Sequence, residues 1–179
     1  VAQADSRTMN PSLPQRVIDE AYERDPISAA AEYGGEFRRD IEAFIPQEAV
    51  DACIDPDRLD LPPLSANRYS AFTDPSGGSQ DGMTLAIGHR EADTLVVDAV
   101  RERVPPFSPD DVVSEFAKLL KTYRVHKVIG DKYGGAWPRE RFREHGVTYV
   151  AAAKPKSDLY RDLLPRLMAG GIALPDNSK

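Results

Sequence analysis

Two aspartates stand directly after predicted β-strands and directly before glycine-containing loops. Asp74 is followed by Pro-Ser-Gly-Gly and Asp131 by Lys-Tyr-Gly-Gly. Sites in open α/β sheets form at the carboxyl ends of strands, so aspartates on neighbouring strands would face each other there. Two close carboxylates repel each other, and a hard divalent cation such as Mg²⁺ or Mn²⁺ relieves that repulsion through the oxygen ligands it prefers. The alternative is that each aspartate only opens a turn.

A third aspartate, Asp81, lies seven residues after Asp74, at the start of the next predicted strand. A hairpin would bring it back beside the first strand, either as an auxiliary metal ligand or as a solvated turn residue. The sequence lacks the motifs of two other kinds of chemistry. The chain has no Walker-type phosphate loop, so no nucleotide is expected in it, and its three histidines accompany no nucleophile elbow.

Basic residues gather in the second half of the chain, around and after Asp131. Five of them are candidates for contacts with the phosphates of DNA, which supply most of the affinity without reading sequence: Lys132, Arg139, Arg143, Lys154 and Lys156. Residues 1–110 carry 10 Lys and Arg against 21 Asp and Glu, whereas residues 111–179 carry 13 against 8. This asymmetry keeps a polyanionic ligand plausible despite the net charge of −6, although ordinary solvated surfaces would produce it too.

The elements that would position these residues follow from hydrophobic periodicity. Apolar, β-branched runs predict three consecutive strands over residues 68–73, 83–89 and 94–101, joined as an antiparallel meander. Helices over 109–121, 138–145 and 157–169 then alternate with strands over 125–130 and 147–152, and Ser108 is a plausible cap for the first of these helices. The order βββαβαβα predicts an α/β fold with a mixed sheet of three antiparallel strands plus parallel strands.

The residues before the first predicted strand show a different pattern. Helical spacing over 12–25, 28–37 and 47–53, followed by a proline-containing stretch, predicts a helical linker or appendage over residues 1–66 and a main domain over 67–179. No apolar run is long enough to span a bilayer. The single cysteine, Cys53, cannot form an intrachain disulfide. Together these features predict a cytoplasmic protein with no membrane partner.

Several motifs, taken in order, resemble the C-terminal nuclease domain of the large terminase subunits of tailed phages and prophages. They are Asp74-Pro-Ser-Gly-Gly, Asp81-Gly-Met-Thr-Leu-Ala-Ile, Pro105-Pro-Phe-Ser-Pro, Gly130-Asp-Lys-Tyr-Gly-Gly-Ala-Trp-Pro-Arg-Glu and Lys156-Ser-Asp-Leu-Tyr. Upstream, Met9-Asn-Pro-Ser-Leu-Pro-Gln and Ala31-Glu-Tyr-Gly-Gly-Glu-Phe-Arg-Arg-Asp-Ile resemble the segment that joins that family's ATPase to its nuclease.

The resemblance implies a ribonuclease-H-like fold with helices on both faces of the sheet. It implies a Mg²⁺- or Mn²⁺-dependent endonuclease that cuts concatemeric double-stranded phage DNA during packaging in a bacterial host cell, with a portal protein and a small terminase subunit as partners. Two metals about 3.5–4 Å apart would promote phosphodiester hydrolysis. Asp74 and Asp131 match the family's first and second carboxylates, and Asp81 matches an acidic position that binds or orients a metal.

The chain also departs from the family pattern. The family's third acidic ligand comes from a later stretch that is absent before Lys179, so a domain truncated at its C-terminus, without the ATPase, is expected. Asp158 is a weak substitute ligand, because its place in the first turn of a helix is explained by the helix dipole. The alternative function is a catalytically incompetent module of the same fold that binds DNA or docks on a portal.

Overall fold

The computed structural model describes residues 14–16, 18–19, 45–131 and 136–177. The chain divides into two compact units, Val1–Glu48 and Ala49–Lys179. In the first unit, residues 15–16 and 18–19 are helical, and Gln15 Nε2 donates a hydrogen bond of 2.9 Å to Asp19 Oδ1. These residues lie inside the helix predicted over 12–25, whereas the helix predicted over 28–37 lies outside the described residues.

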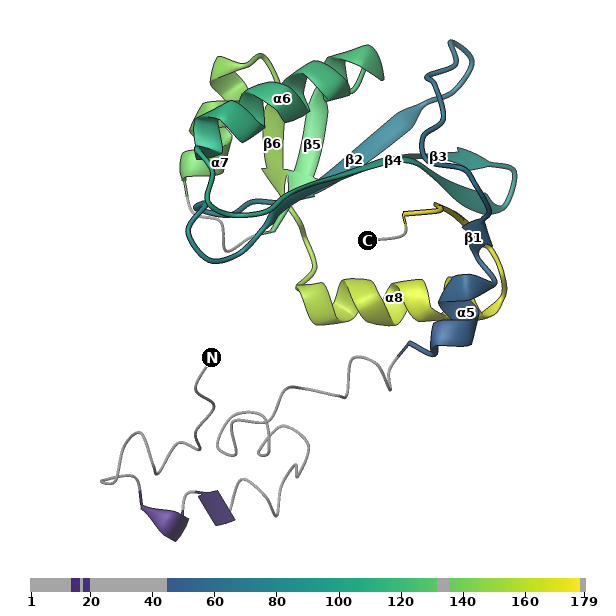
Figure 1. Cartoon of the computed structure of the whole chain (residues 1–179), viewed down its shortest axis with the longest axis horizontal. Helices are drawn as coiled ribbons and strands as arrows, with labels where there is room; N and C mark the ends of the chain where they lie inside the picture. The colour runs from purple at the N-terminus through teal and green to yellow at the C-terminus, as the bar shows by residue number, and fades with distance from the viewer. Residues whose placement is uncertain (1–13, 17, 20–44, 132–135, 178–179) are drawn as a thin grey trace. The chain divides into compact units, whose positions relative to one another are not determined.

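The second unit is built on a seven-stranded sheet of order β1-β7-β4-β3-β2-β5-β6 (Figure 1). The strands are β1 (Ile54–Asp55), β2 (Tyr69–Asp74), β3 (Met83–Glu91), β4 (Thr94–Arg103), β5 (Lys127–Gly130), β6 (Thr148–Ala151) and β7 (Ile172–Pro175). Strands β2, β3 and β4 pair antiparallel, whereas β5 runs parallel to β2 and to β6. The predicted mixed sheet of antiparallel and parallel strands is therefore confirmed.

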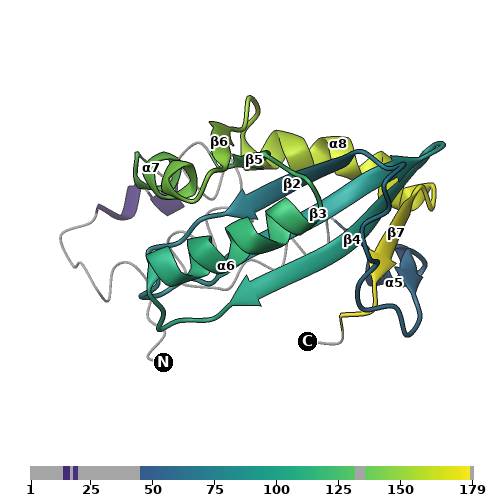
Figure 2. The same ribbon diagram turned by 90° about the horizontal axis from the view of Figure 1, so that it is seen from above.

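Four helices accompany the strands among the described residues from Gln47 onward: α5 (Gln47–Asp51), α6 (Pro109–Thr122), α7 (Trp137–Glu144) and α8 (Lys156–Met168). Helices α6 and α7 lie on one face of the sheet and α8 lies on the other, as Figures 1 and 2 show from two directions. The prediction of helices on both faces is also confirmed. No described helix is long and apolar enough to cross a membrane.

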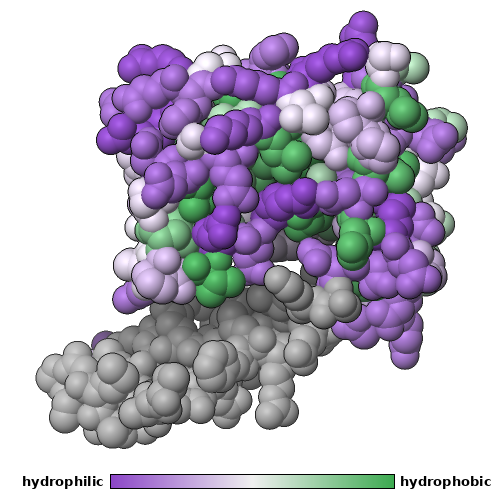
Figure 3. Space-filling view, turned by 45° about the horizontal axis from the view of Figure 1, so that its top comes forward, coloured by the Kyte–Doolittle hydropathy of each residue, from purple (hydrophilic) through white to green (hydrophobic). Residues whose placement is uncertain are grey.

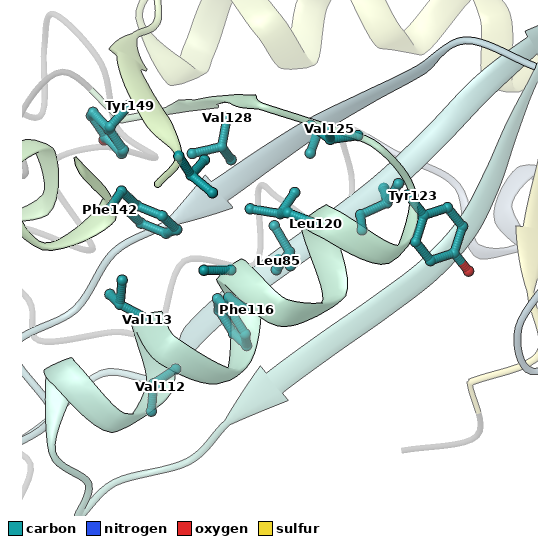
Figure 4. Packing of buried hydrophobic residues seen from close by; sticks show 14 of the residues in the cluster. Leu85, Val112, Val113, Phe116, Leu120, Tyr123, Val125, Val128, Phe142 and Tyr149 are labelled. Atoms are coloured by element: carbon teal, nitrogen blue, oxygen red, sulfur yellow. The ribbon is translucent and has the colours of Figure 1, made fainter. Parts of the chain in front are cut away.

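The core lies between the sheet and helices α6 and α7 (Figure 4). Alternate residues of β3, Met83, Leu85 and Ile87, are buried on this face because successive strand side chains point to opposite sides. Helix α6 contributes a buried stripe at helical spacing, with Phe116 at its centre. Ser108 caps this helix as predicted, since its side chain accepts a hydrogen bond from the Asp111 backbone N–H.

The opposite face of the sheet is more open. Ile129 of β5 and Val150 of β6 are 37% and 39% exposed, and Leu167 is the one buried residue of α8. On the surface shown in Figure 3, hydrophilic residues predominate and hydrophobic residues lie among them. Helix α8 therefore covers this face of the sheet only loosely. It also borders the edge of the sheet that carries the candidate metal site.

Two short strands were not predicted. Strand β7 follows α8 and pairs parallel with β4, and β1 pairs parallel with β7. The Leu174 N–H also donates to the Cys53 carbonyl oxygen at 2.8 Å. Residues 49–66, which the sequence assigns to the N-terminal segment, thus belong to the same compact unit as the sheet.

Candidate metal and nucleic-acid site

Asp74 and Asp131 lie at the ends of adjacent parallel strands. Asp74 is the last residue of β2, and Asp131 directly follows β5. Because Thr73 pairs with Gly130 in the register of these strands, the next residue of each chain segment is an aspartate at the same edge of the sheet. The fold therefore places the backbone of the two aspartates side by side at the C-terminal edge of the sheet.

A pocket of about 630 Å³ opens at this edge. Its lining includes the acidic residues Asp74 and Asp81, together with Trp137 and Lys156. The loop after β2 is folded locally, since Ser76 Oγ donates a hydrogen bond of 2.5 Å to the Asp81 carbonyl oxygen. The hairpin therefore brings Asp81 back to the pocket that Asp74 lines.

A lysine from a distant part of the chain contacts Asp74. Lys156, the first residue of α8, places Nζ 2.8 Å from Asp74 Oδ2. The hydrogen bond with Asp74 raises the pKa of Lys156 against the opposing effect of burial, and the charges of Asp74 and Asp131 raise it further. The edge of the sheet is therefore an environment that favours a positive charge.

A tyrosine supports the second aspartate. Tyr149 of β6 donates a hydrogen bond of 2.7 Å from its hydroxyl group to the Asp131 carbonyl oxygen, and its ring stacks on Phe142 of α7. Burial raises the pKa of Tyr149 to about 12, and the charge of Asp131 acts in the same direction. Gly130 leaves room for this ring, because a Cβ there would lie 2.7 Å from Tyr149 Cζ. The backbone at Asp131 is thus held by the neighbouring strand.

The five predicted DNA-binding residues are placed differently from one another. Arg139 and Arg143 are exposed on α7, and the charge of Arg139 acts against the rise in the pKa of Tyr149. Lys154 forms an ion pair of 2.6 Å with Asp162, and Lys156 binds Asp74 as described. Lys132 lies outside the described residues.

The weak candidate Asp158 lies in the first turn of α8, with its Oδ1 3.3 Å from an Arg161 guanidinium nitrogen. It is not among the described residues that line the pocket. Over residues 45–131 and 136–177, no group of three or more His, Cys, Asp or Glu side chains is arranged to hold a metal ion. Among the described residues, Asp74, Asp81 and Asp131 therefore do not form a three-carboxylate metal cluster, and Asp131 does not line the pocket that Asp74 and Asp81 share.

Two contributions were missed in the sequence, the support of Asp131 by Tyr149 and the pairing of Lys156 with Asp74. A signal for Lys156 existed, because it follows the strand predicted over 147–152 and the carboxyl ends of parallel strands share one edge. The same reasoning that selects Asp131 after β5 therefore points to the residues that follow β6. Nothing comparable marks Tyr149, whose role depends on which strand lies beside it.

Solved structures of phage proteins share this fold. The large terminase nuclease from thermophilic phage G20c matches with a TM-score of 0.61 at 17% identity, over 72% of this chain and 73% of that one. The same nuclease with bound magnesium matches at 0.60 and 18% identity over 73% of each chain, and forms with bound zinc and cobalt match similarly. The HK97 bacteriophage large terminase matches at 0.56 and 13% identity, over 93% of this chain and 43% of that one.

No family model and no curated protein matches the chain. At sequence identities of 17% and 18%, the similarity to these nucleases is a similarity of fold, that is, of the arrangement of helices and strands. The mixed sheet with helices on both faces is the fold that these large terminase nucleases share with the chain. The chain therefore has the ribonuclease-H-like fold that its sequence motifs led us to expect.

Proposed function

We propose that this chain is the nuclease domain of a DNA-packaging terminase, a metal-dependent endonuclease that cuts concatemeric double-stranded phage DNA. The observation that carries the proposal is the juxtaposition of Asp74 and Asp131 at the ends of adjacent parallel strands. Its support is the shared fold with terminase nucleases, one of which has been solved with magnesium, zinc and cobalt.

The residues at the edge supply the type of ligand that a divalent cation prefers. Asp74 and Asp131 offer carboxylate oxygens, the ligands that Mg²⁺ and Mn²⁺ prefer, and Asp81 lines the same pocket as Asp74. The ion pair with Lys156 supports a positive charge beside the Asp74 carboxylate. In the proposed two-metal arrangement, the bound cations would supply an activated water and stabilise the leaving oxygen of the phosphodiester.

The protein's own part in the reaction is positioning. Asp74 and Asp131 would hold the cations, with Asp81 binding or orienting one of them, and Tyr149 keeps the backbone of Asp131 in place. The exposed guanidinium groups of Arg139 and Arg143 would bind backbone phosphates of DNA. Lys132 and Lys154 are proposed to add to this phosphate contact. A portal protein and a small terminase subunit are the proposed partners, in the cytoplasm of a bacterial host.

Cleavage of supercoiled plasmid by the purified chain tests the proposal. We expect nicked and linear products with Mn²⁺ or Mg²⁺, none with EDTA, and loss of cleavage in Asp74→Asn and in Asp131→Asn. Asp93→Asn is the control, because Asp93 is exposed in the turn between β3 and β4. Cleavage that persists in Asp74→Asn, or that needs no divalent cation, would contradict the proposed site.

One observation favours a second candidate, a module of this fold that binds DNA or docks on a portal without cutting. Over the residues that the structure describes, Asp74, Asp81 and Asp131 are not arranged as a group that could hold a metal ion. Such a module would retard duplex DNA in a mobility-shift assay in Mn²⁺ yet leave plasmid intact over the same time. Product formation by the wild-type chain that Asp74→Asn abolishes would exclude this candidate.

A further inference from the structure

The contact between Lys156 and Asp74 joins parts of the chain that are 82 positions apart. Lys156 reaches the end of β2 from the start of α8, a helix on the more open face of the sheet (Figure 1). Both side chains remain half-exposed, at 50% for Lys156 and 39% for Asp74, so the pair can separate without unpacking the core. The contact is therefore a surface ion pair that involves Asp74, a candidate metal ligand.

The ammonium group and a metal ion would compete for the same carboxylate. Nζ of Lys156 lies at hydrogen-bond distance from Asp74 Oδ2, so a cation ligated by this carboxylate would have a positive charge close beside it. Like charges so close repel, so each weakens the binding of the other to the carboxylate. We propose that Lys156 is an internal competitor that lowers the affinity of Asp74 for the divalent cation and is displaced when the cation binds.

Displacement has a consequence for the substrate, and this part of the inference rests on the proposed function. Lys156 and Asp74 line the same pocket, so a released ammonium group would be within reach of a nucleic-acid phosphate bound there. A lysine that leaves a carboxylate for a phosphate oxygen makes cation binding and DNA binding support each other, and such coupling is reciprocal. Lys156 thus makes the divalent cation bind more tightly when DNA is present than when it is absent.

The test measures binding of Mn²⁺ alone to the full chain, by isothermal titration calorimetry and by the electron paramagnetic resonance signal of free Mn²⁺. Lys156→Met removes the charge and keeps the length of the side chain, and Lys156→Arg keeps the charge. Lys118→Met is the matched control, since it removes the same charge from an exposed lysine of α6, on the opposite face of the sheet from α8 (Figure 1). Asp74→Asn is titrated in parallel to establish where the ion binds.

Because exposed ion pairs are weak, we expect Lys156→Met to bind Mn²⁺ about two- to fivefold more tightly than wild type. Lys156→Arg should resemble wild type, and Lys118→Met should change the affinity much less than Lys156→Met. Equal tightening in Lys118→Met and Lys156→Met, or none in Lys156→Met while Asp74→Asn abolishes binding, would overturn the role of Lys156 and leave the metal site standing. Equal binding by wild type and Asp74→Asn would overturn both.

Discussion

Asp131 is held at the edge of the sheet by a tyrosine from the neighbouring strand. The Tyr149 hydroxyl group donates to the Asp131 carbonyl oxygen, and Gly130 gives the ring the space it occupies. Tyr149 is buried and stacks on Phe142, so the ring has little freedom to move aside. The residue before the second carboxylate therefore has to be small.

Gly130→Ala tests this packing. Its Cβ would overlap the Tyr149 phenol ring, and overpacking of this kind costs about 1–3 kcal/mol of unfolding free energy. Gly77→Ala is the control, because a Cβ at Gly77 meets no atom within 4 Å, and it should stay within about 0.5 kcal/mol of wild type. Urea unfolding followed by circular dichroism measures both. Equal stability of the two variants would show that Tyr149 does not constrain this position.

At the residue scale, the sequence predicted candidates but not their partners. Asp74, Asp81 and Asp131 could be selected because each stands where a predicted strand begins or ends. The contact of Lys156 with DNA stays a prediction, and in the structure Lys156 pairs with Asp74. The sequence could place Lys156 at this edge of the sheet, because it follows a predicted strand, but its pairing with Asp74 depends on the direction in which α8 leaves the sheet.

At the scale of elements, the end of α6 is tied to the segment that precedes β2. Tyr123, which follows the last turn of α6, donates a hydrogen bond of 2.5 Å from its hydroxyl group to the Leu61 carbonyl oxygen. Its ring packs edge-on against Tyr69, whose hydroxyl oxygen accepts from the Leu64 N–H at 2.8 Å. Arg101 of β4 secures the same segment through Asp60. Two tyrosines and an ion pair thus fix residues 60–64 on the domain.

Tyr123 makes this attachment sensitive to alkaline pH. Burial raises the pKa of Tyr123, and the charges of Asp60 and Asp98 act in the same direction. In the unfolded chain a tyrosine ionises near pH 10, so the unfolded state releases its proton first as the pH rises. The stabilisation from the neutral phenol is complete below about pH 10 and is lost as the pH rises through the higher pKa of the folded state.

We therefore expect the stability difference between wild type and Tyr123→Phe to shrink with pH. At pH 8 wild type should be more stable by about 1 kcal/mol, the usual value of one hydrogen bond, and near pH 11 the gap should close or reverse. Denaturant unfolding at both pH values measures it, with Tyr160→Phe on the exposed side of α8 as the control. A gap that is constant or grows with pH would contradict this assignment.

Element prediction succeeded where periodicity is long and failed where pairing is distant. The strands that became β2, β3 and β4, and helix α6, have enough residues to display an alternating or helical pattern. Strands β1 and β7 have two and four residues, and each exists because a partner strand from elsewhere in the chain offers hydrogen bonds. These pairings with distant segments leave no local pattern that marks β1 or β7 as a strand.

At the scale of the whole domain, the candidate site is assembled from segments far apart in the chain. Asp74 and Asp81 come from the first hairpin, Asp131 from the end of β5 and Lys156 from the start of α8. The order of the strands brings them together, since β2 lies between β3 and β5. The order of the strands could be predicted from the sequence only through the resemblance to a family. The register that aligns Asp74 with Asp131 is known only from the structure.

The most direct test of the proposed site is a crystal of the chain soaked in Mn²⁺, with diffraction recorded to give the anomalous signal of manganese. We expect an anomalous peak between the carboxylates of Asp74 and Asp131, with Lys156 Nζ moved away from Asp74 Oδ2. Asp74→Asn crystals soaked in the same way should show a weakened peak or none. A wild-type crystal at saturating Mn²⁺ with no anomalous density between these two aspartates would contradict the metal site.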